Sequence, residues 1–129
     1  MALKIVLKPN EKMIVGGAVI KNGPTKAEFF VENKTTLLRE KDILSQKDAT
    51  SLGRRIYFSI QLMYIDQENL VTHHNTYWSL VKEMIQAAPS TVAIIDQISE
   101  SLLGSHYYQA LKLTRKLIEF EQEITDRVS

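Results

Sequence analysis

Alternating residue types near the start of the chain predict short β-strands. The segment 3–7 alternates leucine or isoleucine with lysine or valine, the pattern of a strand with one buried face. Further apolar runs follow, separated by turn-forming residues such as Gly16-Gly17 and Asn22-Gly23-Pro24. These runs cover residues 13–15, 18–20, 27–32 and 36–40. About five short strands at this spacing favour a small antiparallel β-barrel or a twisted sheet.

Beyond residue 44 the apolar residues recur every three or four positions, which predicts helices. Ser45 with Asp48 fits a helix N-terminus, but Gly53 allows a kink, so residues 45–66 are one helix or two. Further helices are expected from residue 75 or 76 to 88, from 90 to 104, and from 105 to near the end. The prediction is an α+β protein, with a β module at 1–44 and a bundle of about four helices at 45–129.

Composition narrows the class of protein. The 129 residues include no cysteine, which excludes disulfides, thiolate zinc sites and cysteine nucleophiles. The longest stretch without a charged residue, Asn69 to Val81, has thirteen residues and contains two histidines, so it is too short and polar to span a bilayer. The N-terminus lacks the pattern of a secretory signal. We therefore expect a cytoplasmic protein with no membrane partner.

Charge is distributed unevenly along the chain. Residues 1–55 carry a formal charge of +5, and residues 56–129 carry −4. Such asymmetry indicates contact between the basic part and a polyanion. The alternative is that lysines on strand edges only prevent aggregation, and the composition leaves both readings open.

No arrangement of residues typical of catalysis is present. Phosphate-loop, dinucleotide-binding, zinc-protease and serine-hydrolase motifs are all missing from the sequence. His73 and His74 would point about 100° apart on a helix, which favours cap or surface roles over a shared metal. The sequence thus predicts no enzyme, no metal and no cofactor. A pocket joining His106 to two carboxylates would be needed to revive a hydrolase hypothesis.

Basic residues on the β module are the main binding candidates. Alternate residues of a strand share a face, so several lysines could form one positive surface that binds RNA phosphates. Phe29 and Phe30 could offer a stacking platform, although we expect both to lie mostly in the core. The RNA-binding candidates are Lys4, Lys8, Lys34, Arg39 and Lys41, with Arg54 and Arg55 at the junction of the two modules.

Aromatic residues of the helical module suggest a second surface. Trp78, Tyr107 and Tyr108 are of the types enriched at protein interfaces, and they are the candidates for binding a protein partner. The alternative, which we favour for most of these rings, is ordinary core packing.

Several segments resemble the FlbT family of flagellin regulators. They are residues 3–16, 18–22, 37–44, 60–66, 104–112 and 115–121. The resemblance covers essentially the whole chain. It implies a bacterial regulator of flagellum biogenesis that associates with the 5′ untranslated region of flagellin mRNA and promotes its degradation.

The segment Leu38 to Ile43 is also similar to the end of the strands of the mRNA-binding regulator CsrA, without the histidine of that motif. That likeness implies RNA contact for Arg39. CsrA is an intertwined dimer, and the helices added here leave open whether this chain forms a homo-oligomer.

We therefore expect a post-transcriptional repressor of flagellin synthesis whose partner is the flagellin mRNA leader. The alternative is a flagellin-binding or export-chaperone-like adaptor that acts on mRNA only indirectly, with flagellin or another flagellar regulator as its partner.

Overall fold

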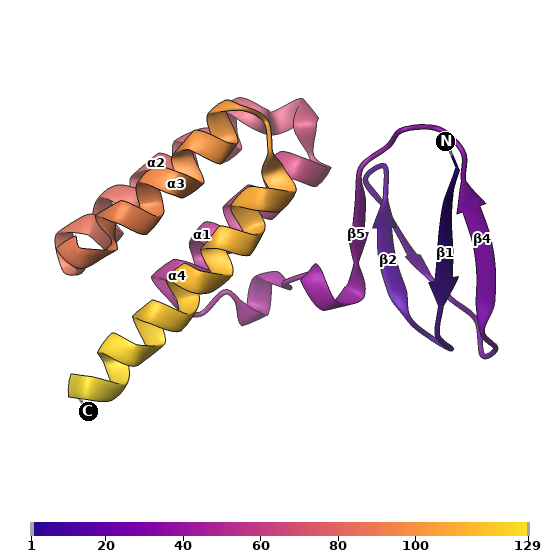
Figure 1. Ribbon diagram of the computed structural model, residues 1–129, viewed down its shortest axis with the longest axis horizontal. Helices are drawn as coiled ribbons and strands as arrows, with labels where there is room; N and C mark the ends of the chain where they lie inside the picture. The colour runs from indigo at the N-terminus through magenta and orange to yellow at the C-terminus, as the bar shows by residue number, and fades with distance from the viewer. Residues whose placement is uncertain (1, 129) are drawn as a thin grey trace. The chain divides into compact units, whose positions relative to one another are not determined.

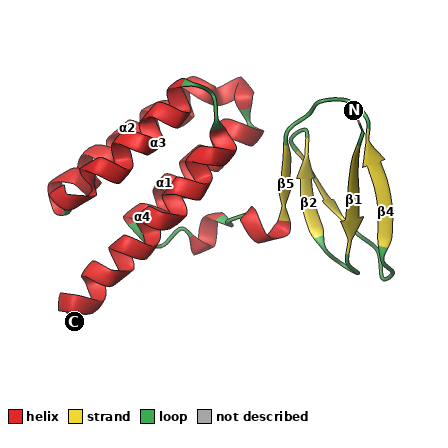
Figure 2. Cartoon of the chain, viewed as in Figure 1, coloured by secondary structure: helices red, strands yellow, loops and turns green. Residues whose placement is uncertain are grey.

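The chain forms two compact units, with the boundary between Ile43 and Leu44 (Figure 1). The computed structural model describes residues 2–128. The first unit is built of strands and the second of helices, as Figure 2 shows by colour. The predicted α+β class is therefore confirmed.

The β unit contains two antiparallel sheets. Strand β1 (Leu3–Leu7) pairs with β4 (Ala27–Val31), and β2 (Lys12–Val15) lies between β3 (Ala18–Lys21) and β5 (Leu37–Arg39). Since β1 and β4 pair only with each other among the described strands, the sheets do not close into the barrel that was one of the expected forms.

One face of each sheet contributes to a common core. Ile5 lies opposite Phe29 in one sheet, and Met13 lies opposite Ile20 in the other. Ile5, Leu7 and Met13 are buried, and Val15, Ile20, Phe29, Val31 and Leu37 pack against them. Strand alternation then turns Phe30 away from this core, and its side chain is 57% exposed. The expectation that both phenylalanines lie mostly in the core is wrong for Phe30.

Turn chemistry fixes how the strands connect. Gly16 and Gly17 have φ values of +57° and +88°, which glycine adopts without strain, and they join β2 to β3. The side-chain Nδ2 of Asn22 donates hydrogen bonds to the backbone carbonyls of Leu7, Lys8 and Thr25. These bonds hold the turn before β4 against the end of β1.

The described part of the helical unit contains four α-helices. Helix α1 (Leu52–Ile65) packs against α2 (Leu70–Ala87) and α4 (Tyr107–Val128), and α3 (Val92–Leu103) packs against α4. The 3₁₀ turns are η1 (Glu40–Asp42), which belongs to the β unit, and η2 (Gln46–Asp48), η3 (Gln67–Asn69) and η4 (Pro89–Thr91).

Two helix starts differ from the prediction. Ser51, not Ser45, is the N-cap of α1, because its side chain accepts a hydrogen bond from the Arg54 amide. The hydroxyl of Ser45 instead bonds to Asp48 within a 3₁₀ turn, so residues 45–66 form one such turn and one α-helix. Helix α2 begins at Leu70, earlier than expected.

Polar contacts join the helices at specific points. The Gly53 amide donates to both carboxylate oxygens of Glu121, at 3.2 and 3.3 Å, which connects the N-terminus of α1 to α4. The fully buried Tyr77 bonds through its hydroxyl to the Ser99 hydroxyl at 2.9 Å. Burial raises the pKa of Tyr77 above its usual value of 10.0.

Candidate nucleic-acid interface

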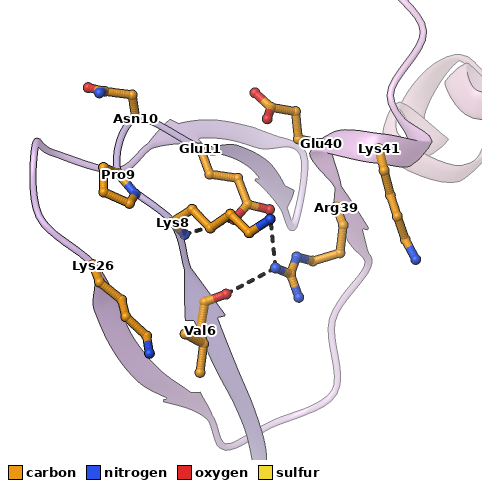
Figure 3. A pocket seen from close by; sticks show the side chains of 9 residues that line it. All are labelled: Val6, Lys8, Pro9, Asn10, Glu11, Lys26, Arg39, Glu40 and Lys41. Atoms are coloured by element: carbon orange, nitrogen blue, oxygen red, sulfur yellow. Dashed lines mark hydrogen bonds and ion pairs between the residues drawn. The ribbon is translucent and has the colours of Figure 1, made fainter.

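A basic pocket of about 800 Å³ lies on the β unit (Figure 3). Its walls come from the end of β1, the turn after it, the residue before β4, and the segment where β5 passes into η1. Four basic side chains line it, against two carboxylates. The lining residues are Val6, Lys8, Pro9, Asn10, Glu11, Lys26, Arg39, Glu40 and Lys41.

The guanidinium of Arg39 is held in place on the pocket wall. Its Nη2 donates to the Val6 carbonyl at 3.0 Å and to the Glu11 carboxylate at 3.1 Å (Figure 3). Its Nε is buried and has no hydrogen-bond partner among the described residues. The side chain as a whole is still 38% exposed. Two fixed bonds therefore orient a cation that solvent can reach.

The carboxylate of Glu11 helps to orient the Arg39 guanidinium and is itself held by a hydrogen bond. Its other carboxylate oxygen accepts a hydrogen bond from the Lys8 amide at 2.9 Å. This backbone bond is the largest cause of a lowered pKa for Glu11; the hydrogen bond and charge of Arg39 add to it, while burial opposes it. Glu11 is therefore ionised at neutral pH and offsets part of the Arg39 charge.

The structure brings three of the predicted RNA-binding residues together. Lys8, Arg39 and Lys41 all line the basic pocket. Lys26 lines it too, although the prediction left it out of the site. Knowledge that β1 pairs with β4 would have indicated Lys26. The last pair of the register is Leu7 with Ala27, and one further pair places Lys26 opposite Lys8.

The other β-module candidates lie outside the basic pocket. Lys4 forms an ion pair with Glu28 at 3.4 Å, so its charge is partly neutralised within the same sheet. Lys34 lines a separate, smaller pocket at the far end of β4, together with Thr35 and Leu37.

Arg54 and Arg55 belong to the helical unit. Both are on the first turns of α1, and Arg55 lines a groove between α1 and α2 with Phe58, Leu62 and Leu80.

The aromatic candidates of the helical module have different environments. Trp78 and Tyr108 are 47% and 46% exposed, which differs from the core packing that we favoured. Tyr107 is half-buried and packs against the Tyr64 ring, with centroids 6.1 Å apart. The Lys112 ammonium lies 5.7 Å from the centre of the Tyr108 ring, which is cation–π distance.

The histidines form no metal site in the part of the chain that is described. His73 Nε2 lies 2.9 Å from an Asp66 oxygen, so this imidazole is paired with a single carboxylate and not with a set of ligands. No group of three or more histidines and carboxylates within residues 2–128 could hold a metal ion. No helix of the described chain is both long and apolar enough to cross a membrane.

The fold and the basic pocket define a class of small α+β protein, in which a five-stranded unit with a cationic pocket precedes four helices. A family model described as flagellar protein FlbT matches residues 3–125. The chain belongs to the FlbT family. No solved structure gives a significant match.

Named relatives cover almost the whole chain. The "Flagellum biosynthesis repressor protein FlbT" of Caulobacter vibrioides is 37% identical over 131 residues, which span 100% of this chain and 93% of the relative. The "Probable flagellum biosynthesis repressor protein FlbT 1" of Bradyrhizobium diazoefficiens is 40% identical over 96% of this chain and 85% of its own length. The similarly named protein of Rhodopseudomonas palustris is 36% identical over 98% of this chain and 100% of its own length.

Proposed function

We propose that this protein represses flagellum biosynthesis after transcription, by binding the 5′ untranslated region of flagellin mRNA and promoting its degradation. Repression is supported by its relatives, which are named as flagellum biosynthesis repressors. The RNA step is supported by one observation on this chain, the basic pocket of the β unit.

The chemistry of the basic pocket suits a phosphodiester. The Nη2 of Arg39 is occupied by Val6 and Glu11, which orient the guanidinium and leave its Nη1 donors for a charge-assisted hydrogen bond to a phosphate oxygen. Lys8 and Lys26 add exposed ammonium groups. Because Arg39 is fixed before binding, less side-chain entropy is lost when a phosphate docks.

The direct test is RNA binding across salt concentrations. Purified protein is titrated against a labelled flagellin leader RNA, and the logarithm of the association constant is plotted against that of the salt concentration. Each phosphate contact contributes about 0.7 to the slope for a single strand. Arg39→Ala and Lys26→Ala should each lower the slope by about that amount.

A matched control is available in the same unit. Lys21 is exposed on β3, does not line the basic pocket, and loses the same charge in Lys21→Ala. This variant should bind with nearly unchanged slope. In bacteria that carry the variants in place of their own protein, flagellin mRNA should be longer-lived with Arg39→Ala than with Lys21→Ala.

Two results would overturn the proposal. One is unmeasurable binding of leader RNA by the intact protein; retention of flagellin after nuclease treatment would then favour the adaptor hypothesis. The other is equal loss of affinity in Lys21→Ala and Lys26→Ala, because the pocket would then have no special role.

A further inference from the structure

The outer face of the β1–β4 sheet carries residues of the basic pocket and also the exposed ring of Phe30. The register places Lys4 opposite Phe30 and Val6 opposite Glu28, and the next pair on this face is Lys8 and Lys26. These side chains share the face that points away from the core, because side chains alternate along a strand. Cations of the pocket therefore lie at one end of the face and Phe30 lies at the other.

Phe30 differs from Phe29, the other aromatic residue of the β unit, in its exposure to solvent. Phe29 packs in the core, whereas the ring of Phe30 is 57% exposed on a two-stranded sheet. Its cross-strand neighbour Lys4 is paired with Glu28 at 3.4 Å, so the ring has an ammonium group beside it whose charge is partly neutralised. An exposed aromatic ring on a surface that also carries cations is the arrangement used to stack unpaired bases.

The distance between the Phe30 ring and the basic pocket suits a short stretch of extended nucleic acid. Phe30 and Lys26 are four residues apart, and a strand rises about 3.3 Å per residue, so they are roughly 13 Å apart along the face. A few nucleotides of a single strand cover this distance. A duplex cannot use both features, because its base faces are already stacked.

We propose that Phe30 is a base-stacking site for single-stranded RNA whose phosphates are bound in the basic pocket. The inference rests on the proposed function and adds to it the form of the ligand. One unpaired base stacks on the Phe30 ring, and phosphates a few nucleotides along the strand lie against Lys8 and Lys26. The occupant is a polyanion because the same face carries the cations Lys8 and Lys26 of the basic pocket at its other end, whereas Lys4 beside the ring is already paired with Glu28.

The first test compares variants of Phe30 on a labelled single-stranded leader RNA. Phe30→Leu keeps an apolar side chain but removes the ring, and it should weaken binding about tenfold, which lies within the range that stacking on one base contributes. Its salt slope should stay unchanged, because no phosphate contact is lost. Phe30→Tyr keeps the ring and should restore wild-type affinity.

A matched control is Val19→Ala on β3. Val19 is 68% exposed but lies in the other sheet, so the loss of its apolar side chain should leave RNA affinity unchanged. Circular dichroism of all variants checks that the β unit keeps its fold.

The second test locates the stacked base. A series of leader RNAs, each with one abasic position, is bound to wild-type protein and to Phe30→Leu. Removal of the base at one position should weaken binding to the wild type and have no further effect on binding to Phe30→Leu. That result identifies this base and Phe30 as a coupled pair. The same RNA annealed to its complement should bind more weakly than the single strand.

The outcomes separate the two proposals. If Lys26→Ala weakens binding while Phe30→Leu binds like the wild type, stacking on Phe30 is refuted and the proposed function stands. If annealed and single-stranded RNA bind equally well, the single-strand preference is wrong. If wild-type protein binds no RNA, both proposals fail.

Discussion

Replacing Gly53 with alanine tests how helices α1 and α4 are joined. In an ordinary helix interior this change stabilises by about 1 kcal/mol, because alanine has the higher helix propensity. Here a Cβ at position 53 would lie 2.7 Å from the Glu121 carboxylate and 3.1 Å from the Ile118 side chain. The carboxylate must move away, and the two hydrogen bonds to the Gly53 amide are lost.

The size of the effect follows from what is lost and gained. A hydrogen bond to a charged group is worth about 1.5–3 kcal/mol. A carboxylate at a helix N-terminus adds about 0.3–1 kcal/mol. The bonds here are long, so we take the lower values and subtract a gain in propensity of at most about 1 kcal/mol, because Gly53 is only the second residue of the helix. Gly53→Ala should therefore destabilise the protein by about 1 kcal/mol instead of stabilising it.

The assay is urea unfolding, followed by far-UV circular dichroism and by fluorescence of Trp78, the single tryptophan, which lies on α2. Glu121→Ala should destabilise by about 1–2 kcal/mol. In that background Gly53→Ala should become neutral or stabilising, because the carboxylate no longer obstructs the new methyl group. Glu123→Ala removes the same charge from an exposed position of α4 and should have little effect.

Two results would refute this reasoning. The first is a Gly53→Ala variant that is more stable than the wild type. The second is an identical change in stability in the presence and absence of the Glu121 carboxylate, which would mean that the two residues are not coupled.

Three further outcomes are expected. Gly16→Ala should destabilise the β unit by about 1–2 kcal/mol, because Gly16 has a positive φ. Gly23→Ala should be nearly neutral, because the space around the new methyl group is open. Amide hydrogen exchange of β2 and β3 measures both effects. Tyr77→Phe should lower the free energy of unfolding in urea by about 0.5–1.5 kcal/mol, because the hydrogen bond between the Tyr77 and Ser99 hydroxyls is lost. No change would mean that this bond contributes nothing. The lowered pKa of Glu11 predicts stability that is fully present above its ordinary value of 4.5 and is lost as the pH falls through the folded value. Glu11→Gln should therefore flatten the acid side of the stability profile, and an unchanged profile would contradict the role given to this carboxylate.

Local pattern was sufficient to find the elements of the fold. Alternation in the segment 3–7 and the turn residues Gly16-Gly17 correctly placed strands and a hairpin. The start of α1 was predicted wrongly at Ser45, because residue type alone does not distinguish this serine from Ser51. Only Ser51 is followed by residues that pack as a helix against α4, and tertiary contacts made that choice.

The candidate site was predicted only in part. Arg39, Lys8 and Lys41 were identified by charge and resemblance, and they do line one pocket. Lys26 was missed and Lys34 was included, because charge along a chain does not show which strands become neighbours. The pairing of β1 with β4 decides both cases.

The sequence by itself determined the strands, the helices and the excess of positive charge in the first part of the chain. These properties depend on the residues at each position and on their near neighbours. Only the tertiary structure decided that Glu11 would hold Arg39, that Lys26 would face Lys8, and that Phe30 would lie outside the core. Each of these depends on pairing between strands distant in the sequence, and a local pattern of apolar and polar residues does not specify its partner.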